Sequence, residues 1–275
     1  MFLTRWTAFF ILLISIAVPA FAWGPEGHQV VADIARSHLS AVAKLEVREL
    51  LGNDDLAAVS TWPDEIKSER PETFGWHFVD IPRSSASFSE KRDCYRPEEK
   101  HPSSLQDHHN CVVDRISMFE QVLANRNASR QDRIEALKFL VHFVGDIHQP
   151  LHAIADARGG NDIHVTEFGS TQCGKFPCNL HSAWDIGLIE HAGHPEKDYA
   201  AYLEKLTLRE RLTGKADGSP EDWANESFRL AKQVWLNDGS SVDEAYYRAN
   251  ISIVDERLAL AGLRLAKILN RVFAK

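Results

Sequence analysis

Apolar residues recur along most of the chain with the three- and four-residue spacing that is typical of amphipathic helices. The clearest stretches are 112–123, 129–147, 221–236 and 243–273. Nearer the start, Pro25 suits a first helical position, and the apolar residues after it keep the helical period. Ser40 is placed to cap a second helix, which Gly52 would end. The pattern therefore predicts a mainly α-helical protein.

Other segments break the helical pattern. Between residues 159 and 179, apolar and polar residues alternate at 163–165 and several glycines follow, which favours a small β-hairpin. Residues 76–80 predict a further strand, and the polar, proline-containing stretch 82–109 predicts a long surface loop. Because no repeat or linker divides the chain, we expect one compact helical domain with a small hairpin and long loops.

The first 22 residues have the composition of a secretory signal peptide. Arg5 precedes an apolar run at 8–18, and Ala20 and Ala22 form a small-residue cleavage site. A retained membrane anchor is the alternative, although the run is short for a bilayer span. Cleavage would leave a domain of residues 23–275 without a membrane span, in a secreted or periplasmic location.

Composition narrows the class of protein further. The chain has 275 residues, a formal charge of −8, 44% hydrophobic residues and 25% charged residues. These values are ordinary for a globular protein and exclude a disordered, collagen-like or multi-pass membrane chain. In an oxidising compartment the four cysteines should pair, and their spacing favours Cys94–Cys111 and Cys173–Cys178. The thirteen histidines are the unusual feature, and they direct attention to metal binding.

Histidine and aspartate occur twice at a spacing of four residues. His142 and Asp146 lie in the helix predicted at 129–147, so both side chains would project from one face. His181 and Asp185 repeat this spacing. Imidazole and carboxylate groups in such pairs suit zinc, although a hydrogen bond along a helix face is the ordinary alternative.

Three further residues are candidates for the same kind of site. Pro150 should end the helix and redirect His152, while Asp64 and His77 are isolated candidates upstream. Asp64 could instead cap a helix after Pro63, and His77 could be a core histidine. The occurrence of all these residues in one exported chain favours a metal site.

The segment Trp23-Gly-Pro-Glu-Gly-His28 and the spacing His142-x3-Asp146-x5-His152 together resemble the zinc-dependent single-strand-specific nucleases of fungi, plants and bacteria. That family shares its fold with zinc phospholipase C, and the resemblance runs from Trp23 to Asp185, followed by a less diagnostic helical tail. It implies three zinc ions in one cleft. The implied ligands are Trp23 (through its α-amino group and carbonyl), His28, Asp64, His77, His142, Asp146, His152, His181 and Asp185.

Within this set the resemblance implies that Asp146 bridges two of the ions. One ion would be held by Trp23 and His28, and the second by Asp64, His77 and His142. The third would be held by His152, His181 and Asp185. His148 falls outside the family pattern, and we interpret it as a supporting or structural residue.

The resemblance also implies roles beyond metal binding. Phe78 would stack on a base and Asn161 would hydrogen-bond the base edge. Asp80 would orient the attacking water or contact the substrate, and Lys67 would steady charge on the phosphoryl oxygens. The alternatives are a tight Gly-Gly turn before Asn161 and solvated Asp80 and Lys67 side chains. Arg158 stands where the family has a second apolar wall, which would make the pocket more cationic.

The implied function is hydrolysis of single-stranded DNA and RNA to 5′-phosphorylated products, endonucleolytically and with action on 3′-nucleotides. The zinc ions would supply a hydroxide for the attack. An acidic chain is unsuited to tight duplex binding, which needs many phosphate contacts. No stable protein partner is implied.

Two alternatives remain at this point. A zinc phospholipase C acting on phospholipid head groups shares the fold, but His28 follows Trp23 much sooner than in the lipases. The last ligand pair also ends in Asp185, where the lipases have glutamate. A non-catalytic zinc-binding protein is the other alternative, and it gives no reason for an aromatic residue at Phe78.

Overall fold

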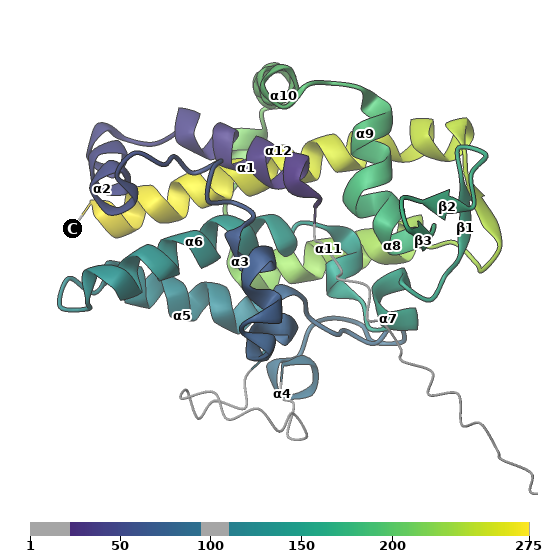
Figure 1. Cartoon of the computed structure of the whole chain (residues 1–275), viewed down its shortest axis with the longest axis horizontal. Helices are drawn as coiled ribbons and strands as arrows, with labels where there is room; N and C mark the ends of the chain where they lie inside the picture. Colours follow the sequence, from purple (N-terminus) through teal and green to yellow (C-terminus); the bar gives the residue numbers. More distant parts are fainter. Residues whose placement is uncertain (1–22, 95–109, 275) are drawn as a thin grey trace, which may run out of the picture.

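Helices make up most of the computed structural model, which describes residues 23–94 and 110–274 (Figure 1). The long helices are α1 (Pro25–Ser37), α2 (Ala41–Leu51), α5 (Val112–Ala124), α6 (Arg130–Asp146), α10 (Glu196–Arg209), α11 (Pro220–Val234) and α12 (Glu244–Phe273). The short helical segments are α3 (Trp62–Glu65), η1 (Ile66–Ser68), η2 (Pro71–His77), α4 (Glu90–Asp93), η3 (Pro150–Ala153), α7 (Ala157–Gly160), α8 (Leu180–Ser182), η4 (Ala183–Gly187), α9 (Leu188–Ala192) and η5 (Leu212–Lys215). The predicted signal peptide and most of the loop predicted at 82–109 lie outside the described residues.

The predicted helix ends agree with the observed ones because their caps are local. The Ser40 side chain accepts a hydrogen bond from the Ala43 amide and begins α2. Gly52 ends α2 with a positive φ of 69°, a conformation that glycine adopts without steric cost. The Ser129 side chain caps α6 in the same way as Ser40 caps α2.

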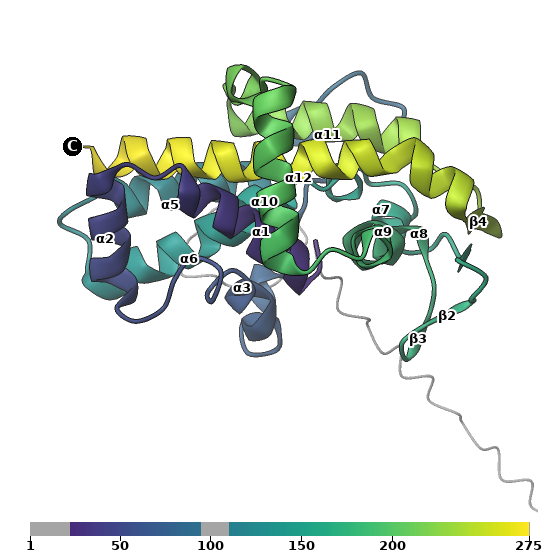
Figure 2. The same cartoon turned by 90° about the horizontal axis from the view of Figure 1, so that it is seen from above.

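Helix α12 runs along the length of the described molecule, and α1, α6 and α10 pack against it (Figures 1 and 2). α1 lies close against α12 at Gly262, where a Cβ atom would lie 2.6 Å from the Ile34 side chain. Helix α6 packs between α5 and α12 and is buried from Leu137 to its end, except at Lys138. The end of α6, which carries His142 and Asp146, therefore lies in the interior.

Strands are few and short. β2 (Gln172–Cys173) and β3 (Phe176–Pro177) form an antiparallel hairpin in which Cys173 pairs with Phe176. This confirms the hairpin predicted between 159 and 179. At its base the Val165 amide donates to the Cys178 carbonyl at 3.1 Å and the Leu180 amide to the Ile163 carbonyl at 2.8 Å. On its other edge β1 (Val165–Glu167) pairs in parallel with β4 (Ser240–Val242), a contact between distant parts of the chain.

The strand predicted at 76–80 is wrong. The helical segment η2 continues to His77, and the residues after it form single backbone hydrogen bonds rather than a ladder. The Val79 amide donates to the His152 carbonyl at 2.8 Å, and the Phe78 carbonyl accepts from the Val112 amide at 3.0 Å. The alternating burial comes from packing between these two different segments, which produces the same sequence pattern as a strand.

Both disulfides expected from cysteine spacing are present, Cys94–Cys111 and Cys173–Cys178. The second one closes the β2–β3 hairpin. Among the described residues, no helix combines the length and apolar character that crossing a membrane requires.

Candidate metal centre

The described residues bring imidazole and carboxylate groups together in three adjoining groups. Within each group the ligand atoms lie within 4.8 Å of one another. The groups are His28–His142–Asp146, Asp64–His77–His142 and His152–His181–Asp185. Eight of the nine ligands that the family resemblance implies are therefore gathered by the fold. Trp23, the ninth, is fully buried, and the amide of the next residue, Gly24, donates to the Asp185 carbonyl at 2.6 Å.

Helix α6 supplies the centre of the first two groups. His142 and Asp146 lie one helical turn apart and have no exposed surface. The His28 ring from α1 stacks on the His142 ring with centroids 3.9 Å apart. Gly145 permits this approach, since a Cβ atom there would lie 2.8 Å from His28 Nδ1.

The Asp146 carboxylate faces three imidazoles from three different elements. Its Oδ2 lies 2.9 Å from His77 Nδ1 and 3.3 Å from His142 Nε2, while Oδ1 lies 3.3 Å from His28 Nε2. Asp64 Oδ1 lies 3.5 Å from His142 Nε2 on the other side. Asp146 thus faces His28 of the first group and His77 of the second, which is the placement a bridging ligand requires.

Backbone carbonyls fix the orientation of three of the histidines. Each of these rings donates from Nδ1 to a carbonyl, so Nε2 remains as the atom that can bind a metal. The pairs are His142 with Ser60 (2.7 Å), His152 with His77 (2.8 Å) and His181 with Gly159 (2.7 Å). Hydrogen bonds of this kind are common around metal-binding histidines, because they hold both the tautomer and the ring plane.

Polar atoms without a hydrogen-bond partner are concentrated in this centre. They include both ring nitrogens of His28, Asp146 Oδ1, and Nε2 of His77, His152 and His181. A buried polar atom without a partner costs about 1–3 kcal/mol, and a cluster of them needs a ligand to offset that cost. Lone pairs of nitrogen and oxygen directed at common points fit divalent metal ions, and the mixture of imidazole and carboxylate suits zinc.

Most of the ring nitrogens are in the neutral form that binds metals. Burial lowers the pKa of His77 and of His152 to about 4, and that of His181 to about 3. These histidines therefore carry no proton to displace at neutral pH.

Two members of the centre have a raised pKa. Burial by itself lowers the pKa of His142, but the Asp146 and Asp64 carboxylates outweigh it and raise the pKa to about 10. Burial raises the pKa of Asp185 well above its ordinary value. A divalent cation would reverse both effects, so metal binding and proton release are linked here.

Three other predicted site residues lie close in the sequence to ligands of the first two groups. Lys67 Nζ lies 2.6 Å from Asp64 Oδ1, so the lysine contributes positive charge at the edge of the centre. Phe78 and Asp80 follow His77 directly along the chain and are both half-buried. All three lie within four residues of a candidate ligand, Asp64 or His77.

Asn161 lies beside the third group. Its side-chain amide donates to the Arg158 carbonyl at 2.8 Å at the end of α7. The Arg158 guanidinium forms a bidentate ion pair with the Asp162 carboxylate, and its shortest N–O distance is 2.6 Å. The Asp162 carboxylate therefore offsets part of the positive charge that Arg158 brings to this edge of the site.

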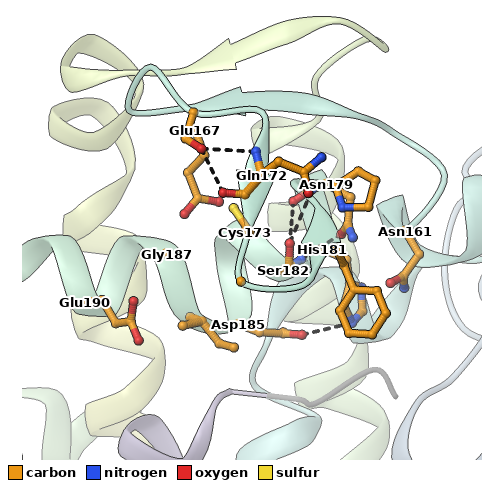
Figure 3. Close-up of a pocket in the computed structure, with 15 residues that line it drawn as sticks. Asn161, Glu167, Gln172, Cys173, Asn179, His181, Ser182, Asp185, Gly187 and Glu190 are labelled. Carbon is orange, nitrogen blue, oxygen red and sulfur yellow. Dashed lines mark hydrogen bonds and ion pairs between the residues drawn. The ribbon is translucent and has the colours of Figure 1, made fainter. Parts of the chain in front are cut away.

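A cavity of about 550 Å³ opens next to the third group (Figure 3). His181, Asp185 and Asn161 lie at one end of it, and Glu167 and Gln172 at the other. Its volume is in the range of small-molecule sites. The third group is therefore accessible from a pocket, whereas Asp146 is completely enclosed.

Sequence reasoning missed Gln149, which holds Asp185 in place. Its side-chain amide donates to Asp185 Oδ1 at 2.5 Å, and its side-chain carbonyl accepts from the Leu151 amide at 2.5 Å. Gln149 is fully buried. No local signal could have identified it, because Asp185 lies in a distant part of the sequence.

His148 is bonded on the side of α6 that faces α11 and α12. Its Nδ1 donates to the Val144 carbonyl at 2.7 Å, and its Nε2 accepts from Arg264 at 2.8 Å. Ser227 and Arg257 donate to the Ile147 and His148 carbonyls. These bonds satisfy carbonyls around the end of α6, next to Asp146, and they account for the position of His148 outside the ligand groups.

Replacing Gln149 with methionine is expected to weaken metal binding by the His152–His181–Asp185 group by about 10- to 100-fold, because Asp185 loses the donor that orients it. Native mass spectrometry over a zinc titration would measure this loss. Ser227→Ala is the matched control, since it removes a buried hydrogen bond that touches no candidate ligand. Equal zinc affinity of Gln149→Met and the wild type would contradict the assigned role.

The helical fold and the buried imidazole–carboxylate centre are those of a metal-dependent hydrolase. The family model for S1/P1 nuclease matches residues 23–274, and the chain belongs to this family. It is 32% identical to Endonuclease 4 of Arabidopsis thaliana over 99% of this chain and 96% of the relative. Nuclease S1 of Aspergillus oryzae is 28% identical over 94% of each chain, and Nuclease P1 of Penicillium citrinum is 28% identical over 91% of this chain and 97% of the relative. These matches confirm the resemblance inferred from the sequence and identify the chain as a nuclease.

Proposed function

We propose that this nuclease hydrolyses phosphodiester bonds in single-stranded DNA and RNA, leaves 5′-phosphorylated products, acts endonucleolytically and also accepts 3′-nucleotides. The observation that carries the proposal is a pair of adjoining ligand groups that share His142 and face the Asp146 carboxylate, beside a third group that opens to a cavity. The printed names of the relatives, endonucleases and nucleases S1 and P1, support the same reaction.

Three zinc ions would occupy the centre. His28 and Asp146, with the amino group and carbonyl of Trp23, would hold the first ion, and Asp64, His77, His142 and Asp146 the second. The third group, His152–His181–Asp185, would hold the third. Bound zinc ions supply Lewis acidity and lower the pKa of coordinated water. The amino group of Trp23 becomes available only after residues 1–22 are removed, so the proposal includes cleavage of the signal peptide.

The remaining site residues would act on the substrate directly. Phe78 would stack on a base and Asn161 would hydrogen-bond the edge of that base. Asp80 would orient the attacking water. Lys67 would hold Asp64 in place and place a positive charge near the phosphoryl oxygens, where negative charge grows during the reaction.

The acidic character of the chain supports the preference for single strands. Duplex binding depends on many simultaneous phosphate contacts with basic residues, and a formal charge of −8 opposes it. A single strand that enters one cleft needs fewer contacts. Two disulfides support an oxidising compartment, and we propose a secreted or periplasmic location.

A gel time course on protein whose first residue is verified as Trp23 tests the function. Single-stranded DNA, RNA and duplex DNA are incubated side by side, with and without a chelator. We expect both single strands to be degraded, the duplex to be spared and the chelator to stop the reaction. A parallel sample that retains Ala22 tests Trp23, because an extended N-terminus should bind less zinc.

Intact single strands in a sample that carries three zinc ions would contradict the proposal. Phosphatidylcholine would then be the next substrate, because the phospholipase C alternative predicts hydrolysis of phospholipid head groups by the same centre.

A further inference from the structure

Phe74 is an apolar residue that the fold leaves exposed beside the metal centre. Its side chain is 46% exposed, and among the described residues only Val42, Leu45 and Leu208 are other large hydrophobic side chains of this kind. Phe74 lies in η2, three residues before the candidate ligand His77. Neither metal binding nor the proposed base stacking on Phe78 explains why Phe74 is exposed there.

The backbone under Phe74 is firmly held. The preceding residue, Thr73, is buried, and its hydroxyl donates to the Arg70 carbonyl at 2.8 Å. Trp76, two residues later, is buried against the ring of Phe139, with centroids 5.5 Å apart. An exposed ring on a rigid support loses little conformational entropy when a ligand binds to it.

Phe74 contacts the ring that is proposed to stack on a base. The centroids of Phe74 and Phe78 lie 5.7 Å apart, and the two ring planes meet at 79°. Phe78 is held in turn by its carbonyl, which accepts from the Val112 amide, and by the next residue, Val79, which bonds to the His152 carbonyl. Both rings therefore have defined positions relative to the metal ligands His77 and His152.

We propose that Phe74 and Phe78 together form a two-ring site that holds two neighbouring bases of a single strand, one base on each ring. The inference rests on the proposed function, in which Phe78 stacks on a base. Each ring offers a stacking surface that accepts any base, since every base has a flat aromatic face.

The angle between the rings connects this site with the choice of substrate. Two bases that lie flat on planes 79° apart cannot stack on each other. A flexible single strand reaches this splayed arrangement at low cost, whereas a duplex must unpair and unstack its bases first. The two-ring site thus selects against a duplex by geometry, in addition to charge.

The test uses single-stranded oligonucleotides with one cleavable phosphodiester and three versions of the flanking bases. One version has both bases, and each of the other two lacks the base on one side of the bond. KM is measured for the wild-type holoenzyme, Phe74→Ala and Phe78→Ala. Phe74→Trp serves as the conservative variant, and Leu208→Ala on α10 controls for the removal of an exposed apolar side chain.

We expect Phe74→Ala to raise KM for the substrate with both bases by about fivefold or more. Phe74→Trp should keep a KM close to that of the wild type. We also expect a crossed pattern, in which Phe74→Ala no longer responds to loss of one base and Phe78→Ala no longer responds to loss of the other. Leu208→Ala should match the wild type.

Two results would overturn the two-ring site. If Phe74→Ala has the KM of the wild type, no base contacts Phe74. If loss of the same base leaves KM unchanged in both variants, Phe74 only supports the Phe78 ring. Failure of the proposed function would look different, because the wild-type holoenzyme itself would then leave every oligonucleotide intact.

Discussion

Replacing Asp146 with asparagine is expected to lower hydrolysis of single-stranded nucleic acid by at least about 10³-fold and to reduce the number of bound zinc ions. Asp146 faces His28, His77 and His142 with its two oxygens, and asparagine offers only one oxygen and no charge. A metal ion stabilises the charge of the transition state by several kcal/mol, and losing about 4 kcal/mol of that stabilisation lowers the rate about 10³-fold. Initial rates together with the zinc content of the purified protein measure both effects.

The matched control for Asp146→Asn is Asp198→Asn, which makes the same chemical change at an exposed position of α10. The control should keep its zinc and its activity. An Asp146→Asn variant that retains all its zinc and hydrolyses single strands at the wild-type rate would refute the role of Asp146 in metal binding.

The second large effect concerns stability. Glu226→Gln is expected to lower the free energy of unfolding by about 3–5 kcal/mol, because it leaves two buried arginines without their counter-ion. Glu226 contacts Arg257 at 2.7 Å and Arg264 at 2.6 Å, and both arginines are almost fully buried. Urea unfolding at a fixed excess of zinc measures the change.

Glu120→Gln is the control, because Glu120 pairs with Arg271, whose side chain is 58% exposed. Exposed ion pairs contribute about 1 kcal/mol or less. If the Glu120 and Glu226 variants lose equal stability, the buried network is not the cause.

The effect of Glu226 should also depend on pH. Burial raises its pKa, but Arg264 and Arg257 outweigh burial and hold the pKa below its ordinary value. A carboxyl with a lowered pKa in the folded protein contributes its full stability above its unfolded pKa of about 4.3. That contribution is lost as the pH falls through the folded value. The difference between wild type and Glu226→Gln should therefore shrink in acid.

Local features of the sequence were sufficient for six of the seven long helices and for part of the site, whereas α10 was not predicted. Ser40, Gly52 and Ser129 mark helix ends through contacts with residues three or four positions away, so they can be read without the fold. The four-residue spacing of His142 and Asp146 places both on one face of a helix for the same reason. The same spacing did not reveal that Asp146 also faces His28 and His77.

The failure at 76–80 has a clear physical cause. Apolar alternation reports which residues are buried, but not what they are buried against. At Val79 the partner is the His152 carbonyl, and at Phe78 it is the Val112 amide. Each partner lies far away in the sequence, so a local pattern carries no information about it.

By itself, therefore, the sequence determined the helical class, the helix ends, the disulfide pairs, the family and the residue types of a metal site. Only the tertiary structure decided how those residues meet. Packing of α1 and α6 against α12 brings His28 to Asp146, and the turn after α6 brings Gln149 to Asp185. Packing of η2 against α5 and α6 leaves Phe74 exposed beside Phe78. Caps and periodicity arise from neighbours within about one helical turn, whereas a site assembled from distant segments exists only once the chain has folded.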